Sequence, residues 1–376
     1  MKEESHSSAP LFFILGRPRS GTTLLRLLLD IHPNVVVPPE FPIIPILANK
    51  FRKIKRWDRE KVLFFIDHIY ENHKFGHRTI DQLRIDRKTL TQNLLNQLPG
   101  ATLADLFTTF NASYGSPFIK GHLDLVGDKN PLYSIFIKQL MKIFPDAKFV
   151  CLVRDYRDTF CSLRSLTAAP IESPNVALQA SRWRFVVKRF YGYAKEYPDR
   201  FYLLRYEDLA SQPEHSFRKI TNFLGIPYDE SVFTFYLQRD KIIDTYSEEN
   251  IRKFHRNLIY PINTGRVNIW KDKMSSEEVA MADQIAGKYA DNLGYERKYK
   301  DFNFKIYLES RPMAIYSYLF FKFLEYEILM PYGFRKFIAL KMKNLVRLYM
   351  KANPELDVTP IRSGNKTFPE HSLQSS

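Results

Sequence analysis

Apolar residues along the chain occur in short continuous runs that end at glycine, proline or charge, and amphipathic segments follow several of these runs. A continuous apolar run is typical of a buried strand, and apolar positions repeating every three to four residues are typical of a helix. Buried strands are expected to begin at Leu11, Val35, Leu123, Lys148 and Phe201. Their alternation with helical segments predicts an α/β fold, in which a central, mainly parallel sheet carries helices on both faces.

The helical segments are unevenly spread along the chain. Residues 43–112 are mostly helical by pattern, which predicts a helical insertion beside the sheet. Further helices are expected at 174–196, after Pro213 and from Ser275 or Ser276 onward, with a stop at Gly294. The stretch 240–273 is polar and is expected to form a loop. These expectations give a main domain over 11–300, preceded by a polar segment at 1–10.

The loop after the first strand combines two glycines, Gly16 and Gly21, with arginines and the start of a leucine-rich helix. The N–H groups of a first helical turn have no partner within the helix, so together with the helix dipole they favour a phosphate or sulfate. The spacing of the glycines matches the nucleotide P-loop, yet Thr22 stands where that motif requires lysine. Arg19 is placed to reach over a phosphate together with the hydroxyls of Thr22 and Thr23. A tight strand–helix turn with solvated arginines is the alternative.

Two charged residues are expected at the same edge of the sheet as this loop. Glu40 follows the second strand and is surrounded by Pro38, Pro39 and Pro42, which predict a rigid loop. Lys129 follows the third strand. Because the carboxyl ends of parallel strands share one edge, where open α/β sheets place ligands, both side chains are candidates for the site. A solvent-facing glutamate and a surface lysine in a turn are the alternatives.

A second anion site is predicted after the strand that begins at Lys148. Arg154 ends this apolar run, and Ser162 follows eight residues later on the next helix. This spacing lets the guanidinium group and the hydroxyl converge on one phosphate, with arginine forming a bidentate bond. Arg154 could instead simply cap the strand.

Composition narrows the classes of partner. The chain has 376 residues, of which 45% are hydrophobic, and a formal net charge of +15. Such an excess of positive charge implies an anionic partner and says nothing about the fold. The only cysteines, Cys151 and Cys161, show no spacing typical of a disulfide framework or a metal site. The polar N-terminus is not typical of a signal peptide, so the sequence favours a cytoplasmic enzyme.

The segment from Gly16 to Thr23 resembles the 5′-phosphosulfate loop of sulfotransferases that use 3′-phosphoadenosine 5′-phosphosulfate (PAPS), with arginine in place of the commoner lysine. The continuation through Glu40 is similar to the tyrosylprotein sulfotransferase branch, and the resemblance covers about residues 11–296. It implies that Glu40 is the general base and that Lys129 contacts the bridging oxygen beside the departing sulfuryl group. The predicted catalytic residues are Glu40, Lys129 and Arg19. The predicted nucleotide-binding residues are Arg17, Arg19, Ser20, Gly21, Thr22, Thr23, Arg154, Ser162, Tyr206 and Arg266.

The implied reaction is transfer of a sulfuryl group from PAPS to an acceptor hydroxyl without a metal ion. His122 is a second candidate base, because the cytosolic branch of the superfamily uses a histidine. Pro39 and Pro42 replace an acid and an arginine of the tyrosylprotein pattern, so the acceptor stays open among a lipid, a carbohydrate, a small alcohol and a peptide. A P-loop kinase using ATP and a non-catalytic basic module that binds a membrane or polyanion are the alternatives, and nucleic acid is not an expected partner.

A C-terminal extension follows the region of resemblance. Its first part, 301–353, is expected to be helical, and 333–351 combines six basic residues with apolar ones and no acid. A basic amphipathic helix of this kind suits peripheral contact with an anionic membrane, such as the inner surface of the cell membrane. Docking of its apolar face on the enzyme itself is the alternative. The polar tail, 354–376, is expected to be disordered.

Overall fold

The computed structural model describes residues 9–71, 74–75, 78–166 and 175–327. Its centre is a five-stranded sheet in the order β2-β5-β1-β6-β7, in which every pair of neighbours is parallel. The strands are β1 (Leu11–Gly16), β2 (Val35–Val36), β5 (Leu125–Lys129), β6 (Lys148–Val153) and β7 (Phe201–Arg205). The predicted α/β fold with a parallel sheet is confirmed.

The sheet is buried on both faces, which explains why its strands are apolar runs rather than alternating patterns. On one face, Phe13 of β1 stacks on Phe149 of β6, with ring centroids 5.2 Å apart, and Phe149 stacks on Phe201 of β7. The other face carries Ile14 and Val150, which are completely buried. The sheet therefore separates the two main parts of the hydrophobic core, one on each face.

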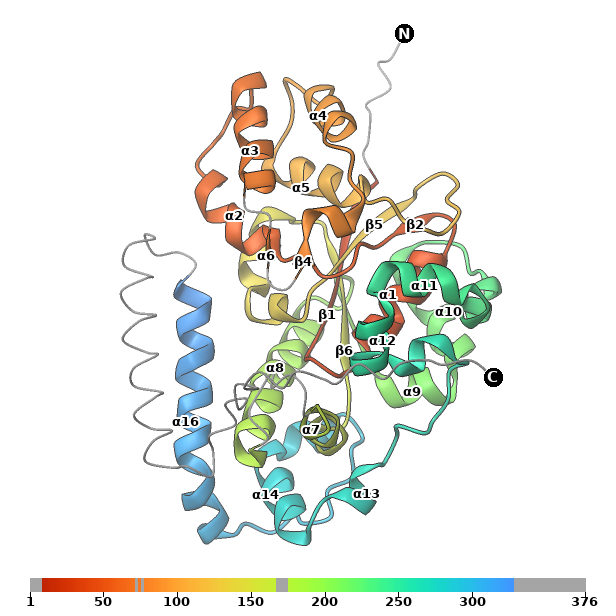
Figure 1. Cartoon of the computed structure of the whole chain (residues 1–376). Coiled ribbons are helices and arrows are strands. Elements are labelled where there is room, and N and C mark those ends of the chain that lie inside the picture. The colour runs from red at the N-terminus through yellow and green to blue at the C-terminus, as the bar shows by residue number, and fades with distance from the viewer. Residues whose placement is uncertain (1–8, 72–73, 76–77, 167–174, 328–376) are drawn as a thin grey trace, which may run out of the picture.

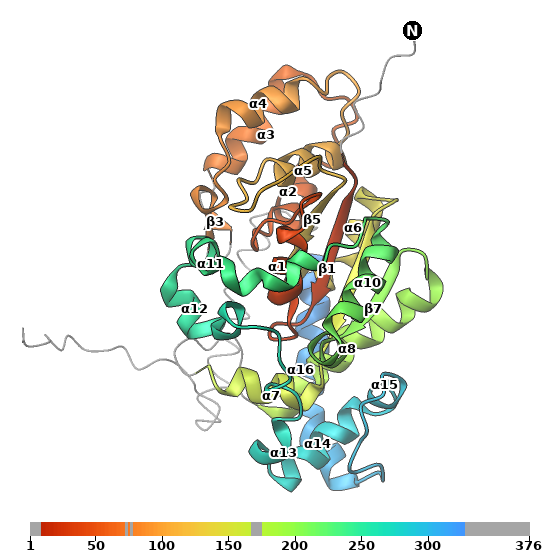
Figure 2. The same cartoon turned by 90° about the vertical axis from the view of Figure 1, so that its right-hand side faces the viewer.

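Helices close to the phosphate loop cover the face that carries Ile14. They are α1 (Thr22–Ile31), α9 (Tyr206–Ser211), α10 (Pro213–Leu224), α11 (Arg239–Tyr246) and α12 (Glu248–Phe254), together with the 3₁₀ helices η3 (Glu230–Gln238) and η4 (Arg256–Ile259). Figure 2 shows α10, α11 and α12 around α1. The prediction that 240–273 is a loop is wrong, since α11, α12 and α13 (Trp270–Lys273) lie in it. The physical reason is that their few apolar residues are separated by charged ones in the sequence. The side chains of Ile242, Tyr246 and Ile251 are nevertheless buried and pack α11 and α12 against the core.

Most of the remaining helices cover the face that carries Phe13. The segment predicted to be mostly helical contains α2 (Ile43–Phe51), α3 (Arg59–Glu71), the hairpin β3 (Lys74–Phe75) and β4 (Arg78–Thr79), η1 (Ile80–Leu83), α4 (Arg87–Leu95) and α5 (Leu103–Ala112). These helices stand together at the top of Figure 1. Farther along the chain come η2 (Pro131–Ile135), α6 (Ile137–Ile143), α7 (Tyr156–Arg164) and α8 (Val176–Glu196).

The C-terminal part of the described chain packs on α8. It contains α14 (Ser276–Ala286), α15 (Lys288–Asn292) and α16 (Phe304–Glu327). The expected continuous helix up to Gly294 is interrupted at Gly287, whose φ of 56° lies in the left-handed region, where glycine is favoured. Gly294 has a φ of 72° and provides the predicted stop. The predicted basic helix at 333–351 and the predicted disordered tail at 354–376 lie outside the described residues.

Candidate active site

One large cleft lies at the carboxyl edge of the sheet, where β1, β5 and β6 end. Its volume is about 1280 Å³, which exceeds the roughly 300–1,000 Å³ of ordinary small-molecule pockets. The cleft is lined by the phosphate loop, by the ends of β5 and β6, by segments of α7 and α8, by residues from Tyr246 to Arg266, and by α16. A cleft of this size has room for a nucleotide and a second substrate together.

The phosphate loop has the backbone geometry that an anion site needs. Gly21 precedes α1 with a φ of 95°, and a Cβ atom at this position would lie 2.5 Å from the ring of Tyr206. Only glycine therefore fits here. Thr22 and Thr23 begin α1 and line the cleft. The first N–H groups of a helix have no partner within it, so those of Thr22 and Thr23 are suited to bind a phosphate or sulfate group.

Ser20 and Arg17, which were predicted to bind the nucleotide, make hydrogen bonds within the protein. The Ser20 hydroxyl donates a hydrogen bond of 2.7 Å to the Arg17 carbonyl oxygen, and the Ser20 side chain is buried within the loop and does not line the cleft. Arg17 lines the cleft, and its Nη2 donates a hydrogen bond of 2.7 Å to Oε1 of Gln179 on α8. Ser20 thus shapes the loop, and Arg17 ties it to α8.

Three arginines from distant segments meet beside the loop. Arg19, which has a φ of 70°, donates from Nε to Oγ of Ser162 over 3.1 Å and from Nη1 to the carbonyl oxygen of Phe254 over 2.7 Å. Arg154 donates from Nη1 to the Arg19 carbonyl oxygen over 3.1 Å and from Nη2 to the Arg266 carbonyl oxygen. The Arg19 side chain, expected over the loop with the threonine hydroxyls, instead bonds to the residue predicted for the second anion site.

The electrostatics of this cluster favour an anion. Burial lowers the pKa of Arg19 to about 10, and the positive charges of Arg154 and Arg266 contribute to the same shift. A pKa lowered by like charges means that the cationic form is under repulsion, which a phosphate placed among the three guanidinium groups would relieve. The Arg154 guanidinium group also lies 4.7 Å from the ring centroid of Tyr206. The cluster with Tyr206 therefore offers both charge and an aromatic surface to a nucleotide.

The predicted base and the predicted lysine form an ion pair at the other side of the loop. Lys129 is the last residue of β5 and is 2% exposed, whereas Glu40 is 28% exposed and lines the cleft. The Lys129 ammonium group contacts Oε1 of Glu40 and donates a hydrogen bond of 3.2 Å to the hydroxyl of Thr23. The lysine therefore links the carboxylate directly to the first turn of α1.

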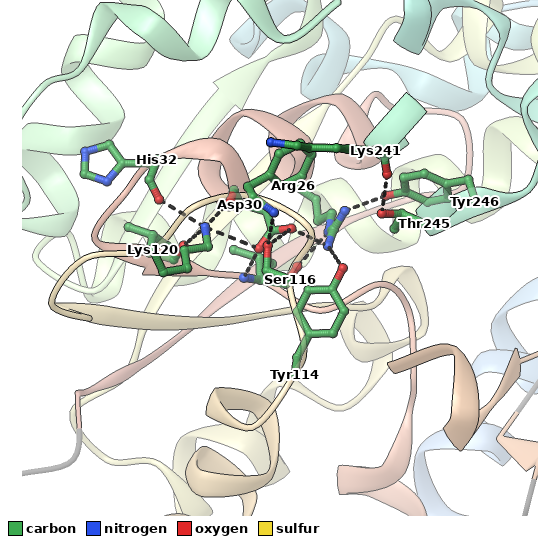
Figure 3. A network of polar contacts seen from close by, with 12 residues as sticks. Arg26, Asp30, His32, Tyr114, Ser116, Lys120, Lys241, Thr245 and Tyr246 are labelled. Atoms are coloured by element: carbon green, nitrogen blue, oxygen red, sulfur yellow. Dashed lines mark hydrogen bonds and ion pairs between the residues drawn. The ribbon is translucent and has the colours of Figure 1, made fainter. Parts of the chain in front are cut away.

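A buried polar network that the sequence reasoning missed supports this arrangement (Figure 3). Arg26 of α1 is completely buried and donates from Nε to the carbonyl oxygen of Val37, three residues before Glu40. Its Nη2 pairs with Asp30 at 2.8 Å, and its Nη1 donates to the hydroxyl of Tyr246 at 3.2 Å. The signal in the sequence was an arginine and an aspartate four residues apart inside a leucine-rich helix.

The same network anchors the chain that precedes β5. The hydroxyl oxygen of Tyr114 accepts a hydrogen bond of 3.1 Å from Nη2 of Arg26, and the Ser116 hydroxyl donates one of 3.2 Å to Asp30. Lys120 donates to the carbonyl oxygens of Asp30, His32 and Val35. Burial lowers the pKa of Lys120 to about 8. The three carbonyl oxygens replace the water that burial removes from around its ammonium group.

His122, the second candidate base, lies elsewhere. It comes just before β5, at the opposite edge of the sheet from Lys129, its side chain is 88% exposed, and it does not line the cleft. This position separates His122 from the predicted reaction centre.

No group of three or more histidine, cysteine, aspartate or glutamate side chains within 9–71, 74–75, 78–166 and 175–327 is arranged to hold a metal ion. Cys151 and Cys161 are both buried and free. In the same part of the chain no helix is both long and apolar enough to cross a membrane.

Comparison with known proteins identifies the class. Residues 10–230, more than half of the chain, match the model of the sulfotransferase family. The chain therefore belongs to the sulfotransferase family. It is an enzyme that transfers a sulfuryl group from PAPS to a hydroxyl group, and this assignment is favoured over the kinase and the non-catalytic basic module.

Curated relatives place the chain near the tyrosylprotein branch of this family. Protein-tyrosine sulfotransferase 1 of Danio rerio is 28% identical over 292 residues, which are 76% of this chain and 72% of that protein. Protein-tyrosine sulfotransferase 1 of Homo sapiens is also 28% identical, over 77% of this chain and 71% of that protein. The predicted resemblance to the tyrosylprotein branch is confirmed.

The fold is also found among solved structures. The sulfotransferase domain of the olefin synthase from Synechococcus PCC 7002 superposes with a TM-score of 0.51, at 22% identity, over 79% of this chain and 98% of that domain. At this level of identity the likeness supports the fold.

Proposed function

We propose that the cleft has a donor half and an acceptor half that meet at the phosphate loop. The donor half consists of the loop residues Gly16–Thr23 with Arg154, Ser162, Tyr206 and Arg266. It binds PAPS, with the 5′-phosphosulfate on the loop and the 3′-phosphate between Arg154 and Ser162. The observation that carries this assignment is the convergence of Arg19, Arg154 and Arg266 on one point beside the glycine loop. Arg19 then serves the 3′-phosphate side of the nucleotide, since its guanidinium group bonds to Ser162.

The acceptor half contains the residues that move the proton and stabilise charge. Glu40 accepts the proton of the acceptor hydroxyl while the acceptor oxygen forms its bond to sulfur and the bond from sulfur to the phosphate oxygen breaks. Lys129 and the N–H groups of the loop neutralise the charge that grows on the departing phosphate. The contact of Lys129 with both Glu40 and Thr23 supports these roles, because one ammonium group touches the carboxylate and also reaches the loop.

Positioning and charge stabilisation are then the main sources of catalysis, as in phosphoryl transfer. No metal ion is required in this scheme, because the loop, Lys129 and the arginine cluster already supply the positive charge. The other product is 3′-phosphoadenosine 5′-phosphate (PAP).

The experiment that tests the donor half is calorimetric titration with PAP, and with ATP plus magnesium for comparison. The wild type should bind PAP tightly without a metal ion and prefer it to ATP. Arg154→Ala should lose about 10- to 100-fold in PAP affinity, since a hydrogen bond to a charged group contributes about 1.5–3 kcal/mol. Arg56→Ala removes an exposed arginine of the insertion and is the matched control. A preference for ATP, or equal PAP affinity in both variants, would contradict the assignment.

Location and further partners remain predictions from the sequence. A cytoplasmic enzyme suits two buried cysteines that are free. Peripheral contact of 333–351 with an anionic membrane would appear as co-sedimentation with phosphatidylserine vesicles that weakens as salt is raised.

A further inference from the structure

The last described helix, α16, forms part of the wall of the cleft. It begins at Phe304, well beyond residue 230, where the match to the family model ends. Phe320, Phe321 and Leu324 of this helix line the same cleft as Glu40 and Lys129. A helix outside the family match thus contributes directly to the site.

Several contacts fix α16 in this position. Glu325 is buried and forms an ion pair of 2.7 Å with Arg189 on α8. Gln139 of α6 donates a hydrogen bond of 3.2 Å to the Glu325 carbonyl oxygen. The ring of Phe321 lies 4.9 Å from the ring of Phe185, measured between centroids. The side chains that α16 presents to the cleft therefore belong to a docked wall.

The surface that results is apolar where it approaches the reaction centre. Its other members come from η2 and α8, and we call the whole set the apolar wall: Leu132, Ile135, Val186, Phe320, Phe321 and Leu324. Leu132 is 42% exposed, although it follows Lys129 by only three residues. A hydrocarbon group packed against this wall would bury apolar surface of both partners, and each Å² removed from water would contribute about 25 cal/mol to the binding free energy.

We propose that the acceptor is an alcohol with an apolar body, whose hydrocarbon part packs against the apolar wall while its hydroxyl reaches Glu40. The proposal rests on the proposed function, because it assumes that Glu40 and Lys129 mark the place of transfer. A saccharide or an acidic peptide would bury much less apolar surface against this wall, because its own surface is mainly polar. Arg182 of α8 is buried, and its guanidinium group packs on the rings of Phe320 and Phe321, 5.3 and 5.7 Å from their centroids. The other basic side chains of the cleft include Arg154, Arg252 and Arg266.

The test measures formation of PAP from PAPS with straight-chain primary alcohols from 1-butanol to 1-decanol as acceptors. Cellobiose and an acidic peptide with one tyrosine are the comparison acceptors. The value of kcat/KM should rise about threefold to fourfold for each added methylene group until the wall is covered. Turnover of cellobiose or the peptide without turnover of the alcohols would overturn the proposal, and so would a kcat/KM that does not depend on chain length.

A matched pair of variants on α16 sharpens the result. Leu324→Ala shortens the wall, whereas Leu319→Ala makes the same change on the solvent side of the same helix, where Leu319 is 58% exposed. Leu324→Ala should lower kcat/KM for 1-decanol about tenfold, with little change for 1-butanol, and Leu319→Ala should change neither. Equal values for the two variants would overturn the proposal.

Titration of the same samples with PAP keeps this test separate from that of the proposed function. PAP binding that is unchanged in both variants, together with the loss for 1-decanol in one of them, supports the apolar acceptor. Tight PAP binding without dependence on chain length overturns the apolar acceptor and leaves the donor half standing. Absence of PAP binding in the wild type overturns both.

Discussion

The donor half and the acceptor half of the cleft differ in how their charged groups are held. In the donor half, Arg19, Arg154 and Arg266 lie together, and the hydrogen bonds that Arg154 makes to the other two go to their backbone carbonyl oxygens. In the acceptor half, Lys129 is almost completely buried and is matched at once by the carboxylate of Glu40. The first arrangement is an excess of positive charge, which binds an anion. The second is a balanced pair beside an apolar wall, which favours proton transfer over binding of charge.

Because the two halves hold their charges differently, nucleotide affinity and turnover should respond to different residues. A change in the arginine cluster should weaken nucleotide binding, and a change in the ion pair should slow the reaction at unchanged nucleotide binding. Variants that affect only one of the two quantities test this separation directly.

The largest expected effect is on turnover in Glu40→Gln. The amide keeps the shape of the side chain but cannot accept the proton, and loss of a general base lowers rates by about 10²- to 10⁴-fold. The affinity for PAP should stay unchanged, because Glu40 belongs to the acceptor half. Steady-state kinetics and calorimetric titration of the same sample check both expectations. Glu60→Gln, an exposed glutamate of α3, is the control.

Two outcomes would contradict this separation of roles between the donor half and the acceptor half. Turnover as fast as that of the wild type would remove Glu40 from the role of base. A loss of PAP affinity equal to that in Arg154→Ala would mean that the two halves are not separable.

The second effect concerns the network in Figure 3, which joins the halves. Arg26 starts from the helix of the phosphate loop and bonds to Val37, next to the Glu40 loop, and to Tyr246, which lines the cleft. Arg26→Met removes the closer of the two cations beside Asp30 and leaves Lys120, whose ammonium group lies 3.7 Å from the carboxylate. Breaking a buried ion pair lowers the free energy of unfolding by about 3–5 kcal/mol.

Urea unfolding of Arg26→Met and of the exposed control Arg56→Met measures this effect. A loss in Arg26→Met no larger than in the control would show that the network does not stabilise the fold. Tyr246→Phe removes a single hydroxyl from the network and should lower the free energy of unfolding by only about 1 kcal/mol.

The sequence predicted the two halves unequally, for physical reasons. The sheet could be predicted because its strands are buried on both faces and are therefore apolar runs. The meeting of Glu40 and Lys129 followed from parallel strands, whose carboxyl ends share an edge. The orientation of Arg19 toward Ser162 could not be predicted, because it depends on a positive φ and on the position of Phe254, which lies 235 residues away.

The apolar wall could not be predicted from the sequence either. A pattern of apolar positions predicts that the segment of α16 is a helix, but not which surface the helix covers. The position of α16 depends on the ion pair between Glu325 and Arg189, which lie 136 residues apart in the sequence. The helices α11 and α12 were missed for a different reason, since few of their side chains are apolar and a short polar helix resembles a loop.

The last expected effect concerns stability alone and lies behind the acceptor half, at Asp128, the neighbour of Lys129 in β5. Burial raises the pKa of Asp128 to about 7, although Asn130, Tyr133 and Asn111 hydrogen-bond to its carboxyl group and the charge of Lys129 opposes the shift. The folded protein therefore keeps a proton on Asp128 that the unfolded chain releases above its ordinary pKa of 3.8. Stability from this group is complete below that value, falls as pH rises toward 7, and stays low at higher pH.

The measurement is the difference in free energy of unfolding between the wild type and Asp128→Asn, followed from pH 4 to pH 8 by urea titration. Because asparagine carries no titrating proton, the variant should gain on the wild type by up to about 1.4 kcal/mol for each pH unit in this interval. Asp146→Asn, at an exposed position, should show no such gain. If the difference in free energy of unfolding stayed constant from pH 4 to pH 8, Asp128 would not titrate in this interval. The carboxyl group beside Lys129 would then be ionised throughout, like that of Glu40 in the proposed mechanism.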